Sequence, residues 1–133
     1  MITAKQIQDV LEKYPTLNYF GFGLYDEDSR KREKEFSEEV YQKNLQEQRQ
    51  ELLNAFKQIE YVVNWLSDVD KIKSFNKKRT SYGLKDLAEN SAPNQYISNG
   101  SFIVGATLAG FNIEIVKPNA IFNMSEKSLK NKS

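Results

Sequence analysis

Residues 36–66 read FSEEVYQKNLQEQRQELLNAFKQIEYVVNWL, a stretch without glycine or proline. Apolar side chains recur in it at steps of seven, four and three, which is the heptad spacing of a helical seam that faces another helix. The seam positions are Leu45, Leu52, Phe56, Ile59, Val63 and Leu66. The pattern therefore predicts one long central helix, a rod that begins at about Ser29 or Phe36 and ends at Leu66.

The predicted rod is long for a chain of this mass. Roughly 30 residues at a rise of about 1.5 Å each give a length of about 45 Å, more than a compact domain of 15.4 kDa needs. Few apolar residues occur in its first half, and its outer face is polar. We therefore expect a second copy of the chain or a foreign partner to lie against the rod, with plain solvent exposure as the alternative. A homodimer is the resulting prediction.

A first helix is predicted at the N-terminus. Thr3 and Gln6 have the spacing of a capping box, and Pro15 ends the helix after Tyr14. Its apolar stripe, which we expect to be core, consists of Ile7, Val10 and Leu11.

Residues 17–25, LNYFGFGLY, are rich in aromatic side chains and punctuated by glycine. They predict a strand or a packed loop, in which residues 20, 22 and 24 share one side and residues 19 and 25 the other. Packed under the rod, this cluster is core; exposed, it is a partner surface of the hot-spot type. The candidate partner residues are Tyr19, Phe20, Phe22 and Tyr25.

Charge is divided between the two halves of the chain. Residues 1–70 carry 9 Lys and Arg against 14 Asp and Glu, a net of −5, whereas residues 71–133 carry 10 against 4, a net of +6. The 133 residues fit a single domain, which we divide into an acidic helical part (1–70) and a basic part (71–133). A basic half suits nucleic acid or an acidic protein, although the two halves can also attract each other within the fold or across a dimer.

The charge changes sign at residues 71–79, KIKSFNKKR, where five basic side chains surround one aromatic ring. Basic side chains release counterions from phosphates, and aromatic rings stack on unpaired bases, so the segment suits a phosphate backbone. A solvated basic linker has the same composition. The candidate residues for binding nucleic acid or an effector protein are Lys71, Lys73, Phe75, Lys77, Lys78, Arg79, Tyr82 and Lys85.

Two short helices are predicted next. The first is capped at residues 80–81 and covers 84–88, and the second is capped at 98–99 and ends at Gly110. Apolar residues occur all round the second helix, so we expect it to be buried rather than to enter a DNA groove.

Two β-like runs, 112–116 and 121–124, follow with a turn at 117–120 between them. Helix, turn, helix and hairpin in this order form the outline of a winged-helix-like module. The polar, basic tail after Glu126 is expected to fray. The predicted fold class is thus mainly α: an N-terminal helix, a long central helix, and a C-terminal helix-turn-helix with a small β-hairpin.

Four motifs mark the C-terminal half: TSYGLK (80–85), YISNGSFI (96–103), AGF (109–111) and PNAIFNMSE (118–126). On these motifs, the chain from Lys78 to Leu129 resembles a set of short proteins of bacterial phages and integrative elements. In that pattern a His often follows the position of Lys85, where this chain has Asp86, which argues against a metal or acid/base role.

The resemblance carries an implication for function. Mobile elements devote many small proteins to handling DNA or to blocking host defence, and the lysine- and asparagine-rich composition is similar to that of anti-CRISPR proteins. It implies a host protein or a ribonucleoprotein effector as the partner.

Catalysis is the function class that composition disfavours most. The chain has no His and no Cys, so the usual base near neutral pH and the usual thiolate nucleophile are missing. No Gly-rich phosphate loop, nucleophile elbow, calcium loop or paired acidic metal motif occurs. We therefore expect a binding protein, not an enzyme, without cofactor or metal. The chain lacks a signal peptide and an apolar membrane span, so we expect it in the cytoplasm.

Two binding functions remain open. The chain is expected to inhibit a host nucleic-acid-guided defence complex by binding the effector or its RNA. The alternative is a small DNA-binding accessory or regulatory protein. Reading base edges needs a polar recognition helix, which the sequence lacks, so contact with RNA is favoured over contact with DNA.

Overall fold

The computed structural model describes residues 2–24 and 37–132. Within them, the predicted mainly α class is confirmed, with six α-helices and two antiparallel hairpins. Tyr25 and both predicted starts of the rod, Ser29 and Phe36, lie outside the described residues. In chain order the elements are α1 (Ala4–Lys13), β1 (Leu17–Asn18), β2 (Gly21–Phe22), α3 (Glu38–Leu53), α4 (Phe56–Trp65), the 3-10 helix η1 (Leu66–Asp68), α5 (Ser81–Glu89), α6 (Asn99–Leu108), β3 (Ile113–Val116), β4 (Asn119–Phe122) and α7 (Glu126–Lys130).

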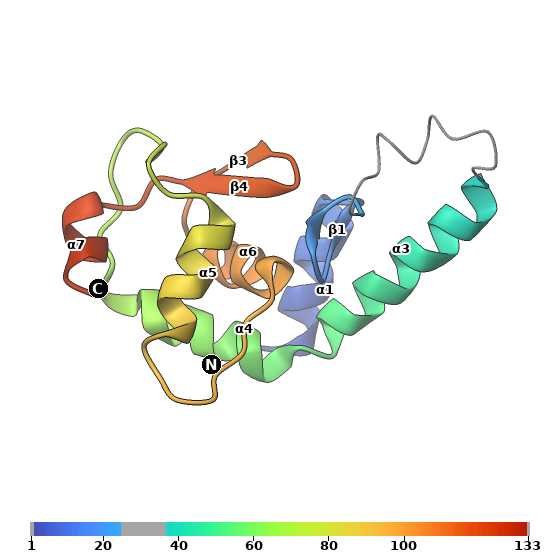
Figure 1. Ribbon diagram of the computed structural model, residues 1–133, viewed down its shortest axis with the longest axis horizontal. Coiled ribbons are helices and arrows are strands. Elements are labelled where there is room, and N and C mark those ends of the chain that lie inside the picture. Colours follow the sequence, from blue (N-terminus) through green and yellow to red (C-terminus); the bar gives the residue numbers. More distant parts are fainter. Residues whose placement is uncertain (1, 25–36, 133) are drawn as a thin grey trace.

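Helix α6 lies at the centre of the molecule, with α1, α4 and α5 packed against it (Figure 1). Every residue from Asn99 to Ala106 is buried, as the sequence predicts. Gly105 permits the close crossing of α4, because a Cβ there would lie 2.5 Å from Cγ1 of Val62. Since α4 comes from the acidic half and α6 from the basic half, the two halves share one core.

Helix α1 forms as predicted. The Gln6 amide N–H donates to Oγ1 of Thr3 over 3.2 Å, and the Thr3 N–H donates to Oε1 of Gln6 over 2.8 Å, which completes the capping box. The three residues of the predicted stripe are buried. The local pattern alone therefore located this helix.

Arg49 of α3 holds the end of α1 and the start of β1. Its guanidinium donates hydrogen bonds to the carbonyl oxygens of Leu11 (2.7 Å), Tyr14 (2.9 Å) and Leu17 (2.8 Å). A cation that satisfies carbonyls at a helix C-terminus is favourable in charge and in hydrogen bonding. Burial lowers the pKa of Arg49. No local sequence pattern predicts this link, because Arg49 lies 32 to 38 positions from its three partners.

The predicted continuous rod is wrong, because the helix is interrupted after Leu53. The Ala55 N–H donates to the carbonyl of Leu52 over 3.1 Å, and the backbone of Ala55 leaves the helical region (φ −90°, ψ 33°). Leu52 and Ile59, on either side of the break, are both fully buried. A core built on a ten-residue α6, about 15 Å long, cannot cover a straight seam of about 45 Å, so the chain turns.

The break also changes which residues of α4 face the core. Ile59 of the predicted seam is buried, but Phe56 and Val63 are only partly buried. Val62 and Trp65 are buried instead. The heptad seam is therefore not continued through α4, and self-association stays a prediction.

The C-terminal tail is ordered, contrary to the expectation that it frays. It forms α7, whose Leu129 is fully buried. The Ser125 N–H donates to the carbonyl of Asp70 over 2.9 Å. Lys132 forms an ion pair of 2.7 Å with Asp68, and its Nζ lies 4.7 Å from the ring centroid of Trp65. One apolar side chain in a polar segment was too weak a signal to predict this docking.

The hairpin β3–β4 is confirmed in type and corrected in position. Ile113 pairs with Phe122 and Val116 with Asn119, so the strands begin at residues 113 and 119 and the loop is two residues long. The peptide bond before Pro118 in that loop is cis. The second strand thus begins two residues earlier than predicted.

Candidate functional site

The β1–β2 hairpin separates two aromatic rings that the sequence placed on one side. Phe20 is 52% exposed, whereas Phe22 is 2% exposed and belongs to the core. Asn18 holds the turn, because its Oδ1 accepts from the Phe20 N–H over 2.9 Å and its Nδ2 donates to the carbonyl of Gly23 over 2.8 Å. A tight turn at residues 19–20 breaks the strand alternation, so Phe22 is not a surface residue.

The hairpin is clamped between the N-terminus of α6 and the β3–β4 loop. The Gly100 N–H donates to the carbonyl of Tyr19 over 3.1 Å, and the Phe22 N–H donates to the carbonyl of Pro118 over 2.9 Å. A Cβ at Gly100 would overlap the carbonyl oxygen of Asn18, so glycine is required there. This close backbone approach sets the position of Phe20.

A cleft of about 570 Å³ lies beside the clamped hairpin. We call it the aromatic cleft; its lining residues are Phe20, Gly23, Tyr82, Asn99, Pro118 and Asn119. The rings of Phe20 and Tyr82 are each about half exposed. The sequence assigned these two residues to separate candidate surfaces, and the structure brings them to one cleft.

Two amide side chains in the aromatic cleft are linked to each other. Nδ2 of Asn99 donates to Oδ1 of Asn119 over 2.9 Å and to the carbonyl of Phe20 over 3.2 Å. Asn99 is 5% exposed, and its Oδ1 is buried with no hydrogen-bond partner. The Nδ2 of Asn119 donates no hydrogen bond within the described part of the chain. One acceptor and one donor in this amide pair are thus unused.

Lys85 lies behind the cleft, between two tyrosine rings. Its Nζ is 4.6 Å from the ring centroid of Tyr82 and 5.8 Å from that of Tyr96, and it pairs with Asp86 (3.1 Å) and Glu89 (3.0 Å). Burial lowers the pKa of Lys85, but the two carboxylates outweigh this effect and the net pKa is raised. The residue is 8% exposed. Lys85 therefore positions the rings and is not available to a phosphate, which corrects its predicted role.

Tyr96 extends this group of rings and was not among the predicted residues. Its ring centroid lies 6.5 Å from that of Tyr19, which in turn lies 5.8 Å from that of Phe20. Tyr96 is 55% exposed, and partial burial raises the pKa of its hydroxyl. Its place two residues before the helix cap at Ser98, next to other rings, has no signature in the local sequence. We call Tyr19, Phe20, Tyr82 and Tyr96 the aromatic surface.

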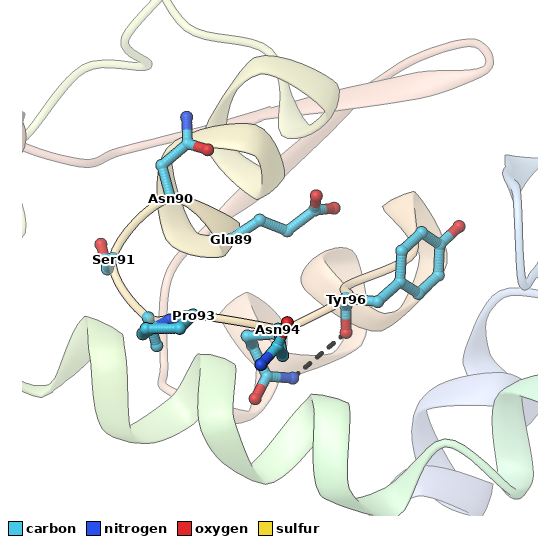
Figure 2. Close-up of a pocket in the computed structure, with 8 residues that line it drawn as sticks. Glu89, Asn90, Ser91, Pro93, Asn94 and Tyr96 are labelled. Atoms are coloured by element: carbon cyan, nitrogen blue, oxygen red, sulfur yellow. Dashed lines mark hydrogen bonds between the residues drawn. The ribbon is translucent and has the colours of Figure 1, made fainter.

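A second hollow, shallow and open to solvent, has a volume of about 620 Å³ and is lined by the loop from Glu89 to Tyr96. Figure 2 shows the loop passing Ser91, Pro93 and Asn94, with the Glu89 side chain extended toward the Tyr96 side. Oε1 of Glu89 already accepts from the Ile97 N–H (3.3 Å) and from Lys85. This carboxylate is therefore occupied in holding the aromatic surface.

The segment 71–79, here called the basic loop, is fixed along the end of β4 and is not a free linker. The Ile72 N–H donates to the carbonyl of Asn123 over 2.9 Å, and the Asn76 N–H donates to that of Phe122 over 2.8 Å. Figure 1 shows the basic loop above α7, where it leads into α5. Backbone pairing thus holds this segment in one conformation.

The side chains of the basic loop divide into two groups. Arg79 forms an ion pair of 2.8 Å with Glu126, and Lys71 places its Nζ 4.8 Å from the Phe111 ring centroid. Phe75 is partly buried. Three exposed lysines make neither an ion pair nor a ring contact with the described residues: Lys73, Lys77 and Lys78. These three remain the candidates for phosphate contact.

Glu126 accepts hydrogen bonds from Arg79 and Asn76 of the basic loop, and these bonds change the pKa of its carboxyl group. Hydrogen bonds from Arg79 and then Asn76 lower the pKa of its carboxyl from 4.5 to about 2. The pKa of Glu126 is thus lower in the folded chain than in the unfolded chain. The charged carboxylate therefore stabilises the fold above about pH 4.5, and this stabilisation is lost as the pH falls toward 2. Because the pair is partly exposed, we expect Glu126→Gln to lower the free energy of unfolding at pH 7 by about 1 kcal/mol.

Urea denaturation of the parent chain and Glu126→Gln at pH 7, 4 and 2 measures this effect. The difference between the two should shrink to nearly zero by about pH 2. Glu114→Gln, which neutralises an exposed carboxylate on β3, is the control and should change little at any pH. A difference at Glu126 that is equally large at all three pH values contradicts the assignment.

Comparisons with protein-family models, with curated proteins and with solved structures found no match to this chain. Among residues 2–24 and 37–132, no three Asp or Glu side chains gather as a metal site would require. Within the same residues, no helix is both long enough and apolar enough to span a bilayer. The features of this chain that indicate a function are therefore the aromatic surface, the aromatic cleft and the basic loop.

Proposed function

We propose that this chain is a non-enzymatic binding protein of a mobile genetic element that inhibits a host nucleic-acid-guided defence complex by binding its RNA. The observation that carries the proposal is the adjacency of two kinds of contact. The basic loop ends at Arg79, and Tyr82 of the aromatic surface follows in the first turn of α5. Exposed lysines and one exposed ring thus occur on one connected segment.

Such a combination suits single-stranded RNA better than a duplex. Lysines neutralise phosphates of any nucleic acid, but rings stack only on bases that are not already stacked and paired. The basic loop is held by backbone pairing, and the rings are held by Lys85, so little ordering entropy is lost on binding. A preformed surface supports affinity for an unpaired strand.

The biological setting rests on the resemblance of the C-terminal motifs to phage and integrative-element proteins, and on a composition like that of anti-CRISPR proteins. The RNA of a guided defence complex is partly single-stranded before it pairs with its target. A protein that occupies this strand blocks pairing without any chemical step.

The alternative, a DNA-binding regulator with a winged-helix-like module, has one supporting observation. Helices α5 and α6 and the hairpin β3–β4 occur in the required order. Against it, a recognition helix must place exposed polar side chains in the major groove, whereas α6 is buried from Asn99 to Ala106. We therefore favour RNA.

The test is reversal of charge at the three exposed lysines, in the triple variant Lys73→Glu, Lys77→Glu and Lys78→Glu. Fluorescence anisotropy with a labelled single-stranded RNA, at several salt concentrations, gives the affinity and its salt slope. Three lost phosphate contacts should flatten the slope by about 2, since each contributes about 0.7 on a single strand. Thermal stability should be nearly unchanged, because exposed charges contribute little to folding.

A matched triple variant, with Glu at Lys13, Lys43 and Lys57, has the same net charge and lies away from the basic loop. It should retain most of the salt slope. Equal losses in the two triples would show a response to net charge alone and would overturn the proposal.

In cells that carry an RNA-guided defence complex, the parent chain should protect an incoming plasmid, and the basic-loop triple should not.

A further inference from the structure

We propose that the aromatic cleft receives one unstacked nucleobase of the bound RNA, an inference that rests on the proposed function and adds a site to it. The three lysines of the basic loop can hold phosphates, but they give no place to a base. The cleft lies directly beyond them along the chain, at Tyr82. Its volume of about 570 Å³ lies in the range of small-ligand sites.

The walls of the aromatic cleft are supported from outside. Lys85 contacts the Tyr82 ring at 4.6 Å from its centroid, and Tyr19 meets the Phe20 ring edge-on at an interplanar angle of 80°. Neither Lys85 nor Tyr19 lines the cleft. Tyr82 and Phe20 nevertheless remain 54% and 52% exposed. Two rings that are held in place and left open are suited to stacking on a base.

The amide pair of the cleft decides between a base and an apolar side chain as the occupant. Oδ1 of Asn99 is a buried acceptor without a partner, and Nδ2 of Asn119 is a donor without a partner within the described residues. Oδ1 of Asn99 is covered by protein atoms, so the group that a ligand can reach is the partly exposed amide of Asn119. A base edge carries acceptors for the Nδ2 of Asn119, whereas a leucine or phenylalanine from a partner protein offers none.

The proposal is tested with two single-stranded oligonucleotides of equal length, one with bases and one of abasic sugar-phosphates, which carry the same charge. The parent chain should bind the abasic strand about tenfold to a hundredfold more weakly than the strand with bases. Tyr82→Ala should lose the same factor on the strand with bases and nothing further on the abasic strand. Its salt slope should match that of the parent.

Two further variants control for folding and for surface exposure. Tyr82→Phe keeps the ring and should bind as the parent does. Val40→Ala removes an exposed apolar side chain from α3, away from the cleft, and should have no effect. In NMR spectra, the side-chain amide resonances of Asn99 and Asn119 should shift with the strand that has bases and stay in place with the abasic one.

The outcomes separate the two proposals. If neither strand binds at any salt concentration, the proposed function itself is overturned. If both strands bind equally and the basic-loop triple weakens both, RNA binding stands and the base site is overturned. The base site is also overturned if Tyr82→Ala weakens the abasic strand as much as the strand with bases, since the ring would then act without stacking.

Discussion

Replacement of Phe102 with alanine is expected to lower the free energy of unfolding by about 3–5 kcal/mol. Phe102 is fully buried in α6, and its ring centroid lies 6.3 Å from that of Trp65 and 5.9 Å from that of Phe122, both in edge-to-face geometry. It therefore joins α4 to β4 through α6. Small domains are stable by only about 5–15 kcal/mol, so a loss of this size removes a large part of the total stability.

Urea denaturation followed by circular dichroism measures this loss, with Phe56→Ala as the matched control. Phe56 was predicted to be a seam residue, but it is only partly buried, so the same change there should cost about half as much or less. Equal losses at the two positions would mean that the core is not centred on α6.

The second large effect is expected at Gly100, where alanine should lower the free energy of unfolding by about 3 kcal/mol, at the upper end of overpacking costs. The added Cβ would overlap the carbonyl oxygen of Asn18, and backbone cannot move aside as a flexible side chain can. The hairpin must then shift away from α6. The hydrogen bond from the Gly100 N–H to Tyr19 should weaken, and the rings of the aromatic surface should move apart.

Gly83→Ala is the matched control, with an expected change of opposite sign. Gly83 is an exposed residue of α5, and the nearest atom to an added Cβ is Oγ1 of Thr80 at 3.9 Å. Alanine in an exposed helix position should raise stability by about 0.5–1 kcal/mol. Amide hydrogen exchange of the Gly100 N–H, compared in the two variants, reports whether the hairpin remains seated. Protection that is unchanged in the Gly100 variant would contradict the clamped arrangement.

Helix ends are the part of this fold that the sequence determined best, because they depend on contacts within one turn. The caps at Thr3, Thr80 and Ser98 form where the pattern places them, and Gly110 has the left-handed backbone (φ +93°) that was expected of it. The burial of α6 was also predictable, since apolar residues on all sides of a helix leave no face for water.

The interruption at Ala55 and the docking of α7 depend instead on the shape of the core. Nothing between Leu53 and Phe56 breaks a helix by itself; the chain turns because its apolar residues must reach a short central helix. Leu129 becomes buried only in the tertiary structure, where Ser125 and Lys132 tie α7 to Asp70 and Asp68. Periodicity indicates which residues avoid water, but it does not give the length of the surface that covers them.

In the candidate site, too, the local features were predictable from the sequence and the long-range contacts were not. Composition alone identified the basic loop and the aromatic run at residues 17–25, because charge and ring content are local properties. Only the tertiary structure brought Phe20 and Tyr82 to one cleft, placed Lys85 beneath the rings, and left Asn99 with an unused acceptor. Phe20 is 62 positions from Tyr82 and 79 positions from Asn99, and such pairings arise from the packing of whole elements, for which no short stretch of sequence carries a signal.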